Sequence, residues 1–301
     1  MTGPGLIELT DRIFIVDSPT GGKFPMAYGF LILGKDTRAL IDTGCGPAAC
    51  RQVIDRFGVD LVINSHCHPD HVSGNHLFAE KPLWVPRERH GETGAVATLS
   101  RRLVGPDPDI MAFWEDWVRS RLLLDDYEPT GTFGDGHVFD FGGVRLEALH
   151  TPGHLDDHYC FLEPDARILF SFDVDLTTFG PFYGNPEADI PLLAASMDRL
   201  TAIEPACVAS SHRLPVTENI REALQDFKGK IKRNQRRVAG ALDRPRTLAE
   251  ICALKPIFGK YIPGVETIYA FFERCMIQKH LDLMASAGRV RMDGDRYILS
   301  E

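Results

Sequence analysis

The chain has 301 residues, of which 44% are hydrophobic and 25% are charged, and its formal net charge is −9. This composition excludes a disordered or fibrous chain and suits one large domain with a smaller one beside it. Residues 1–5 lack a basic start, and no apolar run approaches the roughly 18 residues that a membrane span needs. We therefore expect a cytoplasmic protein without a membrane partner, and seven scattered cysteines without a Cys-x-x-Cys pair predict reduced thiols.

The charge is divided unevenly along the chain. Residues 1–217 contain 17 Lys and Arg against 31 Asp and Glu (−14), whereas residues 218–301 contain 16 against 11 (+5). The basic residues gather on one predicted helix, at Lys228, Lys230, Lys232, Arg233, Arg236 and Arg237. Such a run is most often a solvated helix face, but it also allows contact with the phosphates of a nucleic acid.

Short apolar runs bounded by turn residues predict strands along the first half of the chain. They occupy residues 12–16, 28–33, 38–41, 61–63, 83–85 and 144–149. Apolar residues at helical spacing, each opened by a Pro or an Asp, predict helices over residues 47–57 and 190–203. The sequence therefore indicates a mixed α/β fold.

Residues 91–135 interrupt this pattern as a predicted helical insertion. Residues 98–103 and 110–124 are compatible with helices and carry bulky apolar side chains, among them Phe113, Trp114 and Trp117. Two interpretations remain open: the insertion caps a functional edge of the sheet, or it only packs on the fold.

A dense group of metal-ligand side chains, His66-Cys67-His68-Pro69-Asp70-His71, directly follows the predicted strand 61–63. Imidazoles two residues apart can both face one cation, while Asp70 and His71 on the following turn can hold a second. Cys67 is interpreted as a small residue between two ligands. This spacing predicts a metal site that hydrolyses a substrate.

Three more ligand-type residues stand where predicted strands end. His154 lies in Thr151-Pro152-Gly153-His154, Asp173 follows an apolar run at 168–171, and His212 follows another at 207–211. Seven candidate ligands thus appear in order along the chain.

In this order of ligands the sequence resembles the metallo-β-lactamase superfamily, over roughly residues 6–215, and in particular its glyoxalase-II-like and lactamase-like branches. The resemblance implies a four-layered αβ/βα sandwich with metals at one edge. It also implies that His66, His68 and His154 bind a first metal, that Asp70, His71 and His212 bind a second, and that Asp173 bridges them. Asp42, in Asp42-Thr43-Gly44, looks like the family's Asp-Thr-Gly turn and is expected to support the ligands without binding metal.

The sequence departs from the family pattern at three positions near the site. The family usually carries Gly before the bridging Asp and on both sides of the last His, where this chain has Phe172, Ser211 and Arg213. We expect these larger side chains to narrow the loops around the site. Arg213 is either a contact for an anionic substrate or a solvated loop residue.

The last part of the chain predicts a small second domain. An amphipathic helix from Ile220 to about Leu242 is followed by a capping box at Thr247 and Glu250, a helix over 267–287, and a hairpin turning at 293–294. Helices followed by a hairpin resemble the winged-helix tail of some lactamase-like proteins that act on thioesters or RNA. We therefore divide the chain into a catalytic domain, 1–217, and a helical winged-helix-like domain, 218–301.

The ligand set favours two divalent cations that share a bridging hydroxide as nucleophile. Zinc is the default choice, although iron or manganese also suits imidazole and carboxylate ligands. Asp70 and Asp173 are the expected catalytic residues, with Asp70 helping a proton to reach the leaving group.

Further candidates concern the substrate. Phe179, Phe182 and Tyr183 follow the bridging Asp and are expected to form the pocket wall. His158 either orients a ligand or touches substrate, or it only begins the next strand. The remaining histidines, His76, His90, His137, His150 and His280, are interpreted as structural.

We predict a metal-dependent hydrolase of a small-molecule thioester or ester. The alternatives are a single-stranded RNA endonuclease that uses the basic helix and a non-catalytic, metal-containing ligand sensor. The sequence leaves the oligomeric state open.

Overall fold

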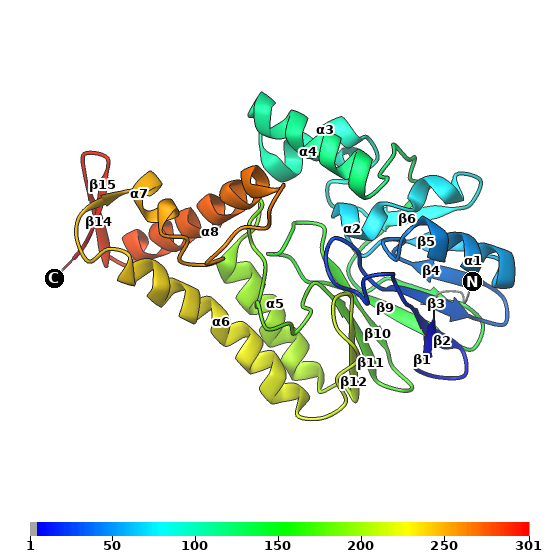
Figure 1. Cartoon of the computed structure of the whole chain (residues 1–301). Helices are drawn as coiled ribbons and strands as arrows, with labels where there is room; N and C mark the ends of the chain where they lie inside the picture. The colour runs from blue at the N-terminus through cyan, green and yellow to red at the C-terminus, as the bar shows by residue number, and fades with distance from the viewer. Residues whose placement is uncertain (1–4, 301) are drawn as a thin grey trace.

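The structure, a computed structural model, describes residues 5–300. Over this range the strands form a seven-stranded, a five-stranded and a three-stranded sheet. The two larger sheets pack face to face with helices on both outer faces, and the long helices α6 and α8 extend to one side (Figure 1). This is the four-layered αβ/βα arrangement that the resemblance implies, so the predicted fold class is confirmed.

The first sheet has the strand order β1-β2-β3-β4-β5-β6-β7. Its first four strands pair antiparallel, and β4 to β7 pair parallel. The strands are β1 (Leu6–Glu8), β2 (Ile13–Val16), β3 (Gly29–Leu33), β4 (Arg38–Ile41), β5 (Leu61–Ile63), β6 (Leu83–Pro86) and β7 (Gly131–Phe133). The parallel pairing brings the carboxyl ends of β4 and β5 to one edge of the sheet.

The second sheet has the order β12-β11-β10-β9-β8. Only β11 and β12 pair parallel in it, so their carboxyl ends also lie together. Its strands are β8 (Val138–Asp140), β9 (Arg145–His150), β10 (Tyr159–Glu163), β11 (Ile168–Phe172) and β12 (Cys207–Ser210).

Alternating side chains along the strands divide the apolar residues between two layers. On β3, Phe30 and Ile32 point into the core between the sheets, where they meet residues such as Phe170, whereas Leu31 points to the outer face. This period of two is the reason why nearly every residue of the central strands is apolar: both of their faces are covered.

Helices cover the outer faces. α1 (Pro47–Phe57) packs Ala49 and Val53 on the first sheet. α5 (Ile190–Ile203) packs on the second, and its N-cap Asp189 accepts a hydrogen bond of 2.8 Å from the Leu192 amide. Both helices have the bounds that the sequence predicted.

The predicted insertion contains two helices, α3 (Val96–Val104) and α4 (Pro108–Arg121), after the short 3₁₀ turn η2 (His90–Glu92). Asp107 caps α4 by accepting hydrogen bonds from two amides of its first turn. Two short elements, α2 (Pro69–Val72) and η1 (Asn75–Phe78), precede it. In Figure 1 the pair α3 and α4 lies above the sandwich, near one end of α8.

The tail consists of α6 (Ile220–Gly240), α7 (Leu248–Ala253), α8 (Glu266–Ser286) and a small sheet of β13 (Arg246–Thr247), β14 (Val290–Asp293) and β15 (Arg296–Leu299). The predicted capping box is present, because Thr247 and Glu250 exchange hydrogen bonds. Phe227 of α6 and Met276 of α8 share one apolar core with Leu169 of the second sheet. The winged-helix class and the boundary at 217 and 218 stay predictions.

None of the helices within residues 5–300 combines the length and apolar character that a membrane crossing requires.

Candidate metal centre

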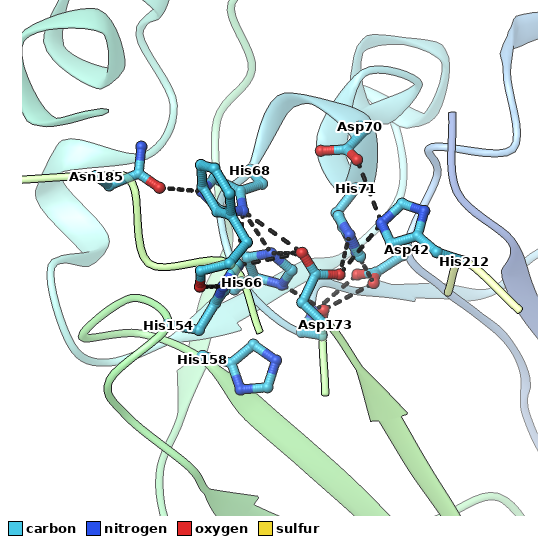
Figure 2. A network of polar contacts seen from close by, with 12 residues as sticks. Asp42, His66, His68, Asp70, His71, His154, His158, Asp173, Asn185 and His212 are labelled. Atoms are coloured by element: carbon cyan, nitrogen blue, oxygen red, sulfur yellow. Dashed lines mark hydrogen bonds and ion pairs between the residues drawn. The ribbon is translucent and has the colours of Figure 1, made fainter. Parts of the chain in front are cut away.

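The strand ends of both sheets deliver the seven predicted ligands to one edge of the sandwich. The cluster from His66 to His71 follows β5, His154 follows β9, Asp173 directly follows β11, and His212 lies two residues after β12. Figure 2 shows their side chains converging from these separate loops. The structure thus brings together all seven residues that the sequence singled out.

The first group contains His66, His68, His154 and Asp173, whose ligand atoms lie within 4.8 Å of one another. His68 Nδ1 is 3.1 Å from His66 Nε2 and 2.8 Å from His154 Nε2. Asp173 Oδ2 lies 3.1 Å from His154 Nε2. Three imidazole nitrogens and a carboxylate oxygen therefore face one point, which is a donor set that suits zinc.

The second group contains Asp70, His71 and His212, also within 4.8 Å. Asp70 Oδ2 lies 3.4 Å from His212 Nε2. The other oxygen of Asp173, Oδ1, is 2.9 Å from His71 Nε2 and 3.4 Å from His212 Nε2. Asp173 therefore presents one oxygen to each group, which is the bridging position that the resemblance implies.

Each of the five ligand histidines has one ring nitrogen that points away from the two groups, here called the outward nitrogen, and its hydrogen bond fixes the orientation of the ring. Each outward nitrogen has an acceptor: Ser65 Oγ for His66, Asn185 Oδ1 for His68, Asp42 Oδ2 for His71, the Phe182 carbonyl for His154 and the Gly22 carbonyl for His212, at 2.7–2.9 Å. In the neutral imidazoles these bonds place the ring proton outside and leave a lone pair facing inward. His71 Nε2 and Asp173 Oδ1 are buried, lie 2.9 Å from each other and have no other hydrogen-bond partner within the described chain, so the inward donor set fits divalent cations.

Asp42 lies in the supporting position expected for it. One of its oxygens accepts hydrogen bonds from Ser65 Oγ and His71 Nδ1, at 2.7 Å each, and the other accepts from the Ser65 amide at 2.8 Å. Gly44 completes the turn because a Cβ there would stand 1.4 Å from the Asp70 carbonyl oxygen. The Asp-Thr-Gly turn therefore buttresses the ligand loop.

Burial and mutual charge set the protonation states. Burial lowers the pKa of His66 and His68, which favours the neutral form that binds metal. Burial also lowers the pKa of His212, but the Asp173 carboxylate outweighs it and raises the pKa to about 9. Burial would raise the pKa of Asp173, but the surrounding histidines, His71 first, hold it well below the usual value. The negative charges here attract cations.

A cavity of about 410 Å³ opens directly onto both groups. Its floor contains His68, Asp70, Asp173 and His212. Above them it is lined by Leu103, Trp114, Trp117 and Leu122 of the insertion and by Val265, Ile268, Tyr269 and Phe272 of the tail. Of the two open interpretations, the structure therefore supports the first: the insertion caps the metal edge.

The five predicted substrate contacts divide into two kinds. Phe179 and Phe182 line the cavity. Tyr183 does not, because it is fully buried and its hydroxyl contacts His280 Nε2 and the Asn234 amide instead. Its expected place in the pocket wall is corrected to a core position that joins α6 and α8.

His158 and Arg213 also lie outside the cavity lining within residues 5–300. His158 is fully buried directly before β10, and its Nδ1 contacts Thr151 Oγ1 at 2.9 Å. It packs against the His66 and His154 rings without bonding either, which excludes substrate contact. Arg213 is exposed and donates to the Leu176 carbonyl at 2.7 Å, so it braces a loop.

The departures from the family's glycines do not narrow the site. Phe172 has a φ of 45°, the left-handed region that favours glycine. Its ring turns away from the metal groups into the core between the sheets, 5.7 Å from the Phe30 ring. Ser211 is likewise fully buried.

Sequence reasoning missed Asn185 and the buried charges behind it. Asn185 donates to the Leu103 carbonyl of α3 at 2.9 Å and accepts from His68. Arg102, the buried neighbour of Leu103 on α3, pairs with Asp157 at 2.9 Å and with Glu187 at 2.6 Å. These residues lie far apart along the chain, and their spacing gives no motif.

The sandwich and its edge of histidines and aspartates define a class of metal-binding hydrolases. The chain belongs to the metallo-beta-lactamase superfamily, whose family model matches residues 23–212. All seven candidate ligands fall within the matched range.

Several relatives are named as lactamase-like proteins or thioesterases. Lactamase-like protein aptB of Emericella nidulans is 29% identical over 57% of this chain and 48% of its own length. The bovine acyl-coenzyme A thioesterase MBLAC2 is 26% identical over 56% and 64%, and an atrochrysone carboxyl ACP thioesterase of Pseudocercospora fijiensis is 24% identical over 83% and 66%. The chain thus spans about half to two thirds of these relatives' lengths.

Solved structures match over nearly the whole chain. A metallo-beta-lactamase family protein from Thermus thermophilus has a TM-score of 0.73 at 20% identity and covers 97% of this chain and 100% of its own. A beta-lactamase domain protein from Burkholderia ambifaria has a TM-score of 0.72 at 18% identity, covering 99% and 95%. At these identities the likeness concerns the fold, tail included.

Proposed function

We propose that the protein is a metal-dependent hydrolase of acyl thioesters, with the two ligand groups holding two divalent cations, zinc by default. The observation that carries the proposal is the junction of these groups with an apolar cavity: a floor that can activate water meets walls that can bind an acyl group. Relatives named as thioesterases support the same interpretation.

When bound, the cations supply Lewis-acid activation of water and of the scissile carbonyl. Asp173 holds the two groups at a fixed spacing by facing both, and the outward hydrogen bonds keep the imidazoles in their binding tautomers. Asp70 lines the cavity floor, where its carboxylate can pass a proton to the departing sulfur. The surrounding apolar side chains exclude bulk water from the reacting bond.

The structure offers less to a nuclease. On α6, Lys228 pairs with Asp198 at 2.5 Å, and Lys230 donates to the Thr177 carbonyl at 2.7 Å and lies 3.6 Å from Asp226. Two of the six basic residues are thus engaged within the chain. The cavity walls are also apolar, whereas a nucleic-acid channel carries cations along its length.

The test is hydrolysis of an acyl-coenzyme A panel beside a labelled single-stranded RNA, with the protein loaded with zinc or manganese. We expect thioester turnover that chelation removes and that His68→Ala loses. The matched control is His90→Ala, which alters an exposed histidine outside both ligand groups and should leave turnover intact.

Two results would contradict the proposal. RNA cleavage lost in His68→Ala would make the protein a nuclease. Stoichiometric metal binding without turnover of any thioester or RNA would favour a ligand sensor.

A further inference from the structure

We propose that the cavity is an acyl-chain site that selects thioesters with a long apolar acyl group over short ones. This inference rests on the proposed function and adds the substrate class to it. The first support is that one cavity contains both the candidate metal ligands and the apolar walls: Asp70, Asp173 and His212 line it together with the aromatic residues. A thioester whose carbonyl lies at the floor therefore has those walls as its neighbours.

The walls have the chemistry of a hydrocarbon site. The insertion contributes Trp114, Trp117 and Leu122, and the tail contributes Val265, Ile268 and Phe272. A short acyl group would leave most of this apolar surface facing water. Because burial of apolar surface drives binding, each methylene that enters the cavity adds affinity until the cavity is full.

The lining also includes a stacked aromatic pair. Phe24, from the loop before β3, is 49% exposed, and its ring stacks on Trp117 of α4 with centroids 5.8 Å apart and planes 15° from parallel. A half-exposed aromatic ring beside an apolar cavity offers surface that a bound apolar group can bury. An acyl chain that passes between this pair and the floor would cover it.

Polar contacts hold two lining residues of the cavity, Phe258 and Thr177, in place, so this part of the wall is already formed. On the tail, buried Glu273 accepts hydrogen bonds from the Ile257 and Phe258 amides at 2.9 and 2.8 Å. On the loop after β11, Lys230 fixes the Thr177 carbonyl. A preformed apolar cavity binds a chain without the cost of opening first.

The test has a kinetic arm and a binding arm. In the kinetic arm, kcat/KM is measured for coenzyme A thioesters from acetyl to palmitoyl with the metal-loaded protein. We expect it to rise by about fourfold for each added methylene and then to level off as the cavity fills. In the binding arm, non-hydrolysable alkyl thioethers are titrated into metal-free protein and followed by the fluorescence of Trp114 and Trp117, with tighter binding expected for longer chains.

A variant that fills part of this cavity tests whether the acyl chain binds there. Val265→Trp narrows the tail wall and should move the optimum to shorter acyl groups. The matched control is Val138→Trp on β8, which is 53% exposed and lies outside the cavity, and its chain-length profile should be unchanged.

The outcomes separate the two proposals. Thioester hydrolysis with equal kcat/KM for acetyl and palmitoyl substrates, or a profile that Val265→Trp leaves unmoved, would overturn the acyl-chain site and leave the proposed function standing. No hydrolysis at any chain length would overturn the proposed function, and the thioether titration would then judge the acyl-chain site alone.

Discussion

The floor and the walls of the cavity are built in opposite ways. The floor consists of short strand-end loops of the sandwich, where each of the five ligand histidines has an acceptor for its outward nitrogen. The walls come from α3, α4 and α8, which pack by apolar contact. The difference shows that the candidate metal ligands and the apolar lining come from different segments, so under the proposed function each can be altered while the other is kept.

The largest expected effect comes from the floor. Asp173→Ala removes a ligand oxygen from both groups at once. We expect turnover to fall by more than about a thousandfold, because the two ligand groups would lose the carboxylate that faces both of them and that would support the proposed metal chemistry. Steady-state kinetics and metal content per chain check this, with Asp11→Ala, which is exposed, as control. Turnover within about tenfold of wild type would contradict the bridging role.

The second effect lies where floor and wall meet. Arg102→Met leaves the buried Asp157 and Glu187 carboxylates without their cation. We expect a loss of about 3–5 kcal/mol in the free energy of unfolding, since removing one partner strands the other charges. Urea unfolding measures it. Arg101→Met, the exposed neighbour on α3, should change stability by less than about 0.5 kcal/mol, and equal effects of the two would exclude the buried network.

A smaller effect tests one hydrogen bond that joins wall to floor, between Asn185 and His68. Asn185→Leu removes the acceptor that keeps the His68 proton on Nε2. We expect zinc affinity to fall by about 10- to 100-fold, the usual cost of losing such a support. Competition with a chelator measures this. Asn234→Leu, which loses only the contact with Tyr183, should leave zinc affinity unchanged; a drop in both would mean general loosening.

The same division explains what the sequence could predict. The ligands of the floor could be predicted from the sequence because they are chemically distinctive. Four of them lie within residues 66–71, directly after a strand that its apolar residues identify. Asn185 could not be predicted, because a lone amide far along the chain has a role at the site only once folding brings it into contact with His68. Tyr183 was misplaced because an aromatic loop residue suits pocket and core equally; the partners His280 and Asn234, supplied by the tail, decide it.

The last expected effect is the pH dependence of the floor. In metal-free protein the Asp173 carboxylate outweighs burial and raises the pKa of His212 to about 9, so below that pH a proton occupies the nitrogen that zinc needs. Zinc affinity should therefore rise by at least about tenfold per pH unit from pH 7 and level off above 9. Protonated His212 also stabilises the metal-free fold: this contribution is complete below its unfolded pKa of about 6.5 and disappears as the pH passes 9.

The two trends run in opposite directions, which makes the prediction strict. Thermal unfolding should show metal-free protein losing stability between about pH 7 and 9.5, while the stabilisation that zinc adds increases over the same range. His212→Gln removes one titrating group and should weaken both trends, while His71, whose pKa burial lowers but the Asp173 and Asp42 carboxylates raise well above its usual value, continues to titrate. A zinc affinity that does not change between pH 7 and 9 would show that no proton is displaced, and the charge balance of the floor would then differ from the one that its carboxylates and imidazoles imply.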